Sequence, residues 1–255
     1  MGFGAVALNE NQPLMRVSGS APVLAVRDKR VTHTLVISDV HLGSPVCQAG
    51  RLLQVLETWK FRRLILLGDI FEDFNLGRLQ KDHWQVLSEI RRLSKPGRGI
   101  EVVWIEGNHD RLVMGVMSRL LGIRVHKRYR FRIGGRNIMA VHGDQFDYFL
   151  IDNPIITDVA SRIYLTVQKY GGSTQRFSRA IKKRSKKWLQ ASNRVARRAL
   201  DFGREVGADI VLCGHTHQPM MRQHGAVTYY NSGCWTDIPS TYLTIDDDGV
   251  TMHEC

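Results

Sequence analysis

The chain has 255 residues, of which 43% are hydrophobic and 24% charged, the composition of an ordinary globular protein. No apolar run approaches the roughly 18 residues that a transmembrane helix needs, so the sequence predicts none. Residues 1–30 lack the pattern of a signal peptide, and we expect a cytoplasmic protein. Four cysteines without framework spacing predict reduced thiols: Cys47, Cys213, Cys234 and Cys255.

The net charge of +12 is concentrated in one segment. Residues 157–204 contain 13 basic and two acidic residues, which gives 13 − 2 = +11 and leaves +1 for the rest of the chain. The sequence therefore predicts a nearly neutral body that carries one strongly basic insert. An anionic partner fits such an insert: a phosphorylated substrate, an acidic lipid surface or a nucleic acid.

The first half of the chain alternates strand and helix patterns after a loose N-terminal arm, predicted over residues 1–30. Apolar, β-branched runs predict strands over 31–38, 64–67 and 102–105. Helical spacing of apolar residues predicts helices over 48–60, 79–94 and 111–121. Strand and helix alternation of this kind is typical of parallel βαβ units.

The second half is richer in hairpin signals. Two apolar arms, 129–132 and 138–141, flank Gly134-Gly135. Two helices are predicted over 155–170 and 174–204, followed by strands over 210–212, 228–230, 242–245 and 250–253. The fold class that fits both halves is α/β, an αββα sandwich of mixed sheets. We expect one domain over residues 31–255, with residues 155–204 inserted as a basic helical cap.

Five short polar motifs follow predicted strands. They are Asp39-Val40-His41, Gly68-Asp69, Gly107-Asn108-His109-Asp110, His142-Gly143-Asp144 and Gly214-His215-Thr216-His217. Ligands gather beyond the carboxyl ends of strands in such sheets, so the five motifs are expected to meet. Carboxylate, amide and imidazole ligands together suit Mn, Zn or Fe.

The number of candidate ligands is sufficient for two metal ions. The candidates are Asp39, His41, Asp69, Asn108, His142, His215 and His217. Asp69 can bridge two cations because a carboxylate has two oxygens. A pair of ions of this kind lowers the pKa of water, and a bridging hydroxide can then attack phosphorus. We assign His109 to transition-state stabilisation or protonation of the leaving oxygen, oriented by Asp110, and Glu72 to a supporting or surface role.

At these motifs the chain resembles the calcineurin-like metallophosphoesterases, whose pattern is D-x-H, GD, GNH[DE], a later H and GH-x-H. The resemblance covers roughly residues 34–218. It implies one metal ion held by Asp39, His41, Asp69 and His217. It implies a second ion held by Asp69, Asn108, His142 and His215.

Within that superfamily the chain is similar to the UDP-2,3-diacylglucosamine pyrophosphatase group, through Ser38-Asp39-Val40-His41-Leu42, Gly68-Asp69-Ile70-Phe71-Glu72 and the helical insert. That resemblance implies hydrolysis of UDP-2,3-diacylglucosamine, a nucleotide-linked lipid, to UMP and 2,3-diacylglucosamine 1-phosphate in lipid A synthesis, usually with Mn²⁺. The group generally has Arg where this chain has His109, and Arg-Pro where it has Gln218-Pro219. His109 belongs to the general phosphodiesterase pattern, so a soluble phosphodiesterase or nuclease is the alternative.

The basic insert allows three interpretations. Phe177, Ile181, Trp188, Val195 and Ala199 lie close to one face of the predicted helix. This face can pack on the body of the protein, or it can meet acyl chains while the cations meet phosphate headgroups on the inner face of a membrane. A nucleic-acid platform is the third possibility, and the small number of aromatic residues disfavours it.

Overall fold

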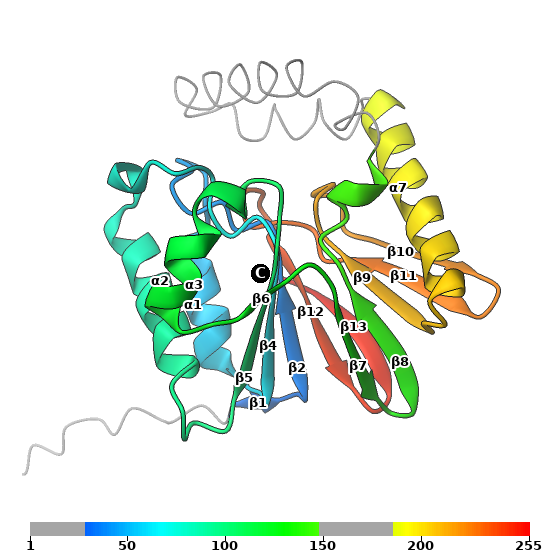
Figure 1. Cartoon of the computed structure of the whole chain (residues 1–255), viewed down its shortest axis with the longest axis horizontal. Helices are drawn as coiled ribbons and strands as arrows, with labels where there is room; N and C mark the ends of the chain where they lie inside the picture. The colour runs from blue at the N-terminus through cyan, green and yellow to red at the C-terminus, as the bar shows by residue number, and fades with distance from the viewer. Residues whose placement is uncertain (1–28, 148–185) are drawn as a thin grey trace, which may run out of the picture.

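A computed structural model describes residues 29–147 and 186–255. Figure 1 shows two β-sheets facing each other, with α1, α2 and α3 on the outer side of one sheet and α7 on the outer side of the other. The described residues thus form the predicted αββα sandwich. The predicted helix over 155–170, the first part of the helix over 174–204 and nearly all of the N-terminal arm lie outside the described residues.

The first sheet has six strands in the order β13-β12-β2-β4-β5-β6. These strands are β2 (Thr34–Ile37), β4 (Arg63–Leu67), β5 (Glu101–Ile105), β6 (Val125–His126), β12 (Thr241–Asp246) and β13 (Gly249–Glu254). Neighbours from β2 to β6 are parallel, whereas β12 is antiparallel to both β2 and β13. The sheet is therefore mixed, with its parallel part drawn from the predicted βαβ region.

The second sheet has five strands in the order β10-β11-β9-β8-β7. These strands are β7 (Tyr129–Ile133), β8 (Arg136–Ala140), β9 (Ile210–Cys213), β10 (Met220–His224) and β11 (Val227–Asn231). The predicted hairpin is confirmed as β7 and β8, and β8, β9 and β11 are parallel neighbours. The strands β1 (Arg30–Val31) and β3 (Trp59–Lys60) form a separate parallel pair.

Successive apolar side chains of a strand enter two different cores, one on each face of the sheet. Val36 joins the core between the two sheets, whereas Leu35 and Ile37 join the core beneath the helices, because successive side chains of a strand point to opposite faces. The helices over the first sheet are α1 (Ala49–Thr58), α2 (Lys81–Leu93) and α3 (Met114–Leu121). Three short 3-10 turns are η1 (Leu76–Arg78), η2 (Asp110–Leu112) and η3 (Asp144–Phe146).

Helix α7 (Lys186–Glu205) is the described part of the predicted insert, and it packs on the second sheet. Val195 and Ala199 are buried against this sheet. The prediction that these two residues could face acyl chains is wrong, because the sheet already covers them. For residues 186–205 the interpretation as a helix packed on the body holds.

Two further predictions can be compared with the described residues. The four cysteines all lie in the described ranges and form no disulfide bond there. No helix in residues 29–147 and 186–255 has the length and apolar character required to cross a bilayer.

Candidate active site

The predicted ligand motifs come from both sheets. Asp39 and His41 follow β2, Asp69 follows β4, and Asn108 follows β5. In the second sheet His142 follows β8, and the motif with His215 and His217 follows β9. Since these are all carboxyl ends of strands, the two facing sheets bring the motifs to one edge of the sandwich.

The backbone is unusual at these motifs. The non-glycine residues with positive φ are Asp39, His41, Asp69, His215 and His217, with φ between 50° and 65°. Within the described ranges there are no others, and all five are predicted metal ligands. The left-handed region is costly for residues with a Cβ, and such strain is concentrated at functional sites. The surrounding fold therefore holds these five side chains in place against a local cost.

Two motif glycines allow the ligands to pack closely. A Cβ on Gly214 would collide with the carboxylate of Asp39 and the hydroxyl of Ser38. Gly68 has φ +86°, and a Cβ there would collide with the ring of His142. The glycine that precedes a ligand in each of these motifs is thus required by the approach of a ligand from another motif.

Asp39, His41 and His217 form the first group of side chains. Nε2 of His217 lies 3.3 Å from Oδ1 of Asp39 and 3.1 Å from Nε2 of His41. Nδ1 of His41 lies 2.9 Å from Oε2 of Glu72. A carboxylate on one ring nitrogen fixes the tautomer and directs the other nitrogen to a metal ion, an arrangement common in metal sites.

Asp69, Asn108, His142 and His215 form the second group. Oδ2 of Asp69 lies 3.2 Å from Nε2 of His142, and Oδ1 of Asn108 lies 3.2 Å from Nδ1 of His215. The same Asp69 oxygen is 4.0 Å from Nε2 of His41, in the first group. Asp69 therefore stands between the two groups, the position that a bridging ligand would occupy.

The contacts of His142 fit a cation. Its Nδ1 is 2.9 Å from the carbonyl oxygen of Leu67, which accepts the ring proton and leaves a lone pair on Nε2. That lone pair faces the carboxylate of Asp69, and Nε2 makes no hydrogen bond of good geometry within the described residues. Two buried acceptors directed at each other are unfavourable unless a proton or a metal ion lies between them.

Without a metal ion, two of the buried rings hold protons. Burial disfavours the charged form of His41, but Glu72, Asp69 and Asp39 outweigh it and raise the pKa to about 9. Burial likewise opposes the charged form of His142, and Asp69 in particular raises its pKa to about 10. Both values exceed the unfolded value of about 6.5. Protonation of the two rings thus contributes to the stability of the metal-free fold. This contribution is complete below pH 6.5 and is lost as the pH rises through about 9 and 10.

We expect metal binding near pH 7 to release about two protons per chain, because a ligating imidazole must be neutral. The affinity for divalent ions should accordingly rise with pH up to about 10, where the second ring loses its proton. Calorimetric titration with Mn²⁺ in two buffers of different ionisation enthalpy counts the protons. A proton count near zero at pH 7 would contradict the assignment of these rings as ligands.

His109 lies beside both groups. Its ring is 5.0 Å from that of His41 and perpendicular to it, and its backbone N–H donates to Oδ1 of Asp69 at 2.9 Å. Its Nδ1 is 2.8 Å from the carbonyl oxygen of Glu72, which accepts a ring proton from it. This contact leaves Nε2 for chemistry at the site.

Asp110 does not make the contact predicted for it. Its buried carboxylate accepts hydrogen bonds from the backbone N–H groups of Ile70, Phe71 and Gly107 and from the indole of Trp104. Burial, followed by the charge of Asp69, raises its pKa to about 6. Asp110 thus braces the loops that carry Asp69 and Asn108, and the His109 ring is oriented by the Glu72 carbonyl instead.

Glu72 is more central than the sequence suggested. Its side chain is buried against His41. Burial opposes ionisation of Glu72, but the hydrogen bond to His41 outweighs it and lowers the pKa of the carboxyl group.

We expect Glu72→Gln to weaken binding of the first metal ion about 10- to 100-fold, as loss of a supporting carboxylate typically does. The neighbouring Asp73 is paired with Arg78. Asp73→Asn is the matched control in a Mn²⁺ titration, and equal affinities in the two variants would refute this role.

Asp147 and a nearby pocket were not predicted. Oδ2 of Asp147 lies 3.4 Å from Nε2 of His215, on the far side of the ring from Asn108. The motif pattern contains no residue at this position, so no sequence signal marked it.

A pocket of about 390 Å³ lies nearby; it is lined by Glu106, Arg111, Lys127, Arg128, Val141, Asp144, Gln145 and Phe202.

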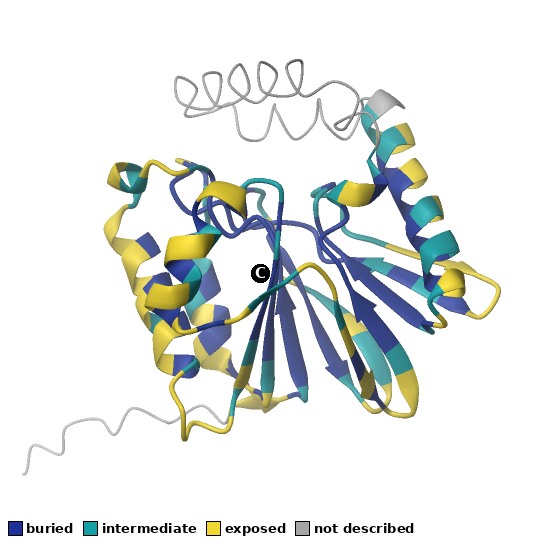
Figure 2. Cartoon of the chain, viewed as in Figure 1, coloured by how far each residue is buried: buried dark blue, intermediate teal, exposed yellow. Residues whose placement is uncertain are grey.

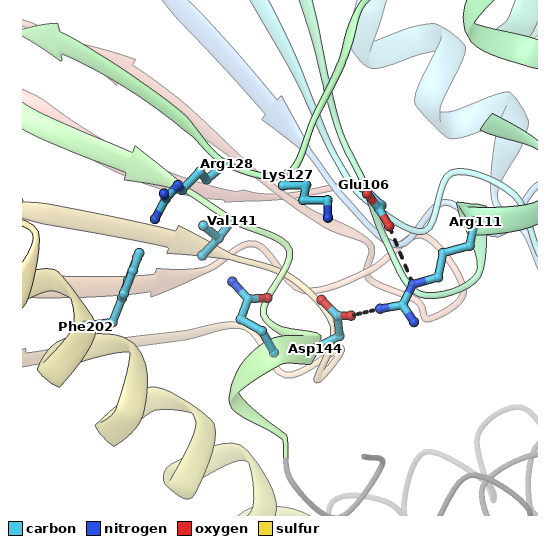
Figure 3. A pocket seen from close by; sticks show the side chains of 8 residues that line it. Glu106, Arg111, Lys127, Arg128, Val141, Asp144 and Phe202 are labelled. Carbon is cyan, nitrogen blue, oxygen red and sulfur yellow. Dashed lines mark hydrogen bonds and ion pairs between the residues drawn. The ribbon is translucent and has the colours of Figure 1, made fainter. Parts of the chain in front are cut away.

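Figure 3 shows Arg111 held between Glu106 and Asp144 at one side of the pocket. Lys127 and Arg128 supply cations on other sides, and neither makes an ion pair with a described residue (Figure 3). Asp144 belongs to the His142 motif, so the pocket adjoins the candidate ligands. Its cations suit an anionic part of a substrate.

Residues 33–248 match the family model of the calcineurin-like phosphoesterase superfamily domain. A protein named UDP-2,3-diacylglucosamine hydrolase from Blochmanniella pennsylvanica is 28% identical over 213 residues, 74% of this chain and 80% of the relative. A protein of the same name from Neisseria gonorrhoeae is 25% identical over 239 residues, 86% of this chain and 98% of the relative. The solved structure of Yfce, a phosphoesterase from E. coli, has 18% identity and a TM-score of 0.46, covering 86% of this chain and 90% of its own.

Proposed function

The chain belongs to the calcineurin-like phosphoesterase superfamily, as a metal-dependent phosphoester hydrolase, and we propose that it cleaves the pyrophosphate of a nucleotide-linked lipid. The proposed substrate is UDP-2,3-diacylglucosamine or a close relative, with UMP and a lipid sugar phosphate as products. The observation that carries the two-metal chemistry of this proposal is the position of Asp69 between two groups of ligand-type side chains, His41 on one side and His142 on the other.

We assign the first metal ion to Asp39, His41, Asp69 and His217, and the second to Asp69, Asn108, His142 and His215. Mn²⁺ is the proposed ion, and this set of ligands also accepts Zn²⁺ or Fe²⁺. When bound, two such ions would activate water and neutralise charge on the phosphoryl oxygens.

We assign to His109 the chemistry at the reacting phosphate that the metal ions do not supply. Its Nδ1 is held by the Glu72 carbonyl, so Nε2 is left to face the reacting phosphate. In its protonated form it can stabilise negative charge or protonate the leaving oxygen. Asp110 is a positioning residue for the adjacent loops, since its carboxylate is fully used by backbone and indole donors.

The similarity to relatives named UDP-2,3-diacylglucosamine hydrolase supports the lipid nucleotide as substrate. The pocket beside the His142 motif offers Lys127 and Arg128 to the anionic part of a substrate of this kind. Residues 155–185 stay predicted as a basic cap for the acyl chains. Peripheral association with the inner face of a membrane is part of the same proposal.

The test compares two substrates under identical conditions. Protein loaded with Mn²⁺ is incubated with UDP-2,3-diacylglucosamine in detergent micelles or with bis-p-nitrophenyl phosphate, and the phosphorus products are identified. We expect the lipid to be cleaved to UMP at the higher kcat/KM. Cleavage of the small diester alone would agree with phosphoesterase activity and reject UDP-2,3-diacylglucosamine as the substrate.

A soluble phosphodiesterase acting on nucleotides or nucleic acid is the second candidate. It is favoured by His109, the residue of the general phosphodiesterase pattern, lying close enough to His41 for their rings to contact. This candidate predicts turnover of cyclic nucleotides or DNA, with an affinity for nucleic acid that falls steeply as salt rises.

A further inference from the structure

The segment from η2 through α3 exposes an apolar stripe. Leu112, Val116 and Leu120 are exposed to 79%, 52% and 61%. They are spaced four residues apart, which places side chains on one side of a helix. Figure 2 shows exposed residues along the outer side of α3. We call these three residues the α3 stripe.

The adjoining stripe of the same helical segment, one position further along the chain, is also apolar. Val113, Met117 and Leu121 are buried in the core beneath the helices. The apolar face of this segment is therefore wider than the part that the core covers, and the uncovered part is expected to have a partner. Three of the large hydrophobic residues most exposed in the described chain fall within nine consecutive positions, so the stripe is not the scattered exposure that is normal on a protein surface.

The charge around the stripe identifies the chemistry of what would cover it. Residues 111–128 contain five basic residues and no acidic residue: Arg111, Arg119, Arg124, Lys127 and Arg128. Arg111 is paired with Glu106 and Asp144. The other four are exposed and make no ion pair with any residue in the described ranges. Aliphatic side chains flanked by unpaired cations are the pattern of a helix that lies in the interface of an anionic bilayer.

Charge also argues against two other occupants. The segment 148–185 has seven basic and two acidic residues, so the cations around the stripe would repel it. A second copy of the chain would present the same basic surface to itself. Nucleic acid is disfavoured because the exposed side chains here are aliphatic and offer no aromatic ring for base stacking.

We propose that the α3 stripe, with Arg119 and Arg124, docks on an anionic phospholipid bilayer. Leu112 lies three residues from His109, so docking here would bring the candidate active site close to the lipid surface. The inference deepens the proposed function, since a lipid substrate resides in such a bilayer. It differs from docking through the basic insert, because none of its residues belongs to that insert.

Vesicle co-sedimentation tests the surface without any substrate. Full-length protein is mixed at low ionic strength with phosphatidylcholine vesicles, with or without about one third phosphatidylglycerol. We expect binding to the anionic vesicles only. Leu112→Gln/Leu120→Gln should lower the partition coefficient about tenfold or more, and Arg119→Gln/Arg124→Gln should lower it by roughly fivefold per cation removed. Val31→Gln/Met221→Gln, two exposed apolar residues on β1 and β10, is the matched control and should bind as wild type.

Turnover of bis-p-nitrophenyl phosphate and the thermal midpoint verify that each variant is folded. Wild-type binding by the leucine variant would overturn the inference, even if the lipid substrate is cleaved. Absence of vesicle binding by the wild type would also overturn it and point to a protein on the stripe. If both surface variants lose vesicle binding but the protein cleaves only small diesters, the docking surface would be supported and the lipid substrate rejected.

Discussion

Asp69→Asn is expected to lower turnover of any phosphoester by at least about 10³-fold, which corresponds to about 4 kcal/mol of transition-state stabilisation. Burial opposes ionisation of Asp69, but His142, His109 and His41 outweigh it and hold its pKa well below the usual range. The carboxylate is therefore ionised and available to two cations. An amide in its place brings a neutral oxygen and an N–H₂ group that cannot ligate.

The measurement is metal content per chain together with turnover of bis-p-nitrophenyl phosphate. We expect Asp69→Asn to lose one or both ions. Asp73→Asn makes the same chemical change at a half-buried residue paired with Arg78, and it should keep both the metals and the rate. Full metal content in Asp69→Asn would reject the bridging role.

His109→Ala is expected to lower kcat by about 10²- to 10⁴-fold, the usual contribution of a positioned acid or base, while both metal ions stay bound. The reason lies in the contacts of the ring, which is hydrogen-bonded to the Glu72 carbonyl and lies beside His41 without being required as a ligand. His224→Ala, on the exposed strand β10, is the control. Equal metal loss in His109→Ala and Asp69→Asn would refute the division of roles.

The strands that carry the site could be predicted because their signal is local. Apolar runs ending in Asp39, Asp69 or His142 mark a strand and a ligand in the same few residues. Because ligands collect beyond the carboxyl ends of strands, the meeting of these motifs could be predicted as well. Strand β10 (Met220–His224) gave no such signal, because most of its residues are exposed, and it forms an edge by pairing with β11.

Contacts between distant segments could not be predicted in this way. Asp110 follows His109 directly, which suggested a pair, but its carboxylate is bound by backbone groups of residues 70 and 71 and by Trp104. Glu72 follows the Asp69 motif by three residues, and only the loop geometry brings it to His41. Similarly, the periodicity of α7 predicted an apolar face and could not tell whether a sheet or a lipid covers it.

The most direct test of the dimetal account is turnover of UDP-2,3-diacylglucosamine as a function of bound Mn²⁺ per chain. If Asp69 joins two ions into one catalytic centre, UMP release stays low up to the first equivalent and reaches its plateau only at two. A plateau at one equivalent would contradict the bridged pair. No UMP release at any loading, with the small diester still cleaved, would contradict the proposed substrate.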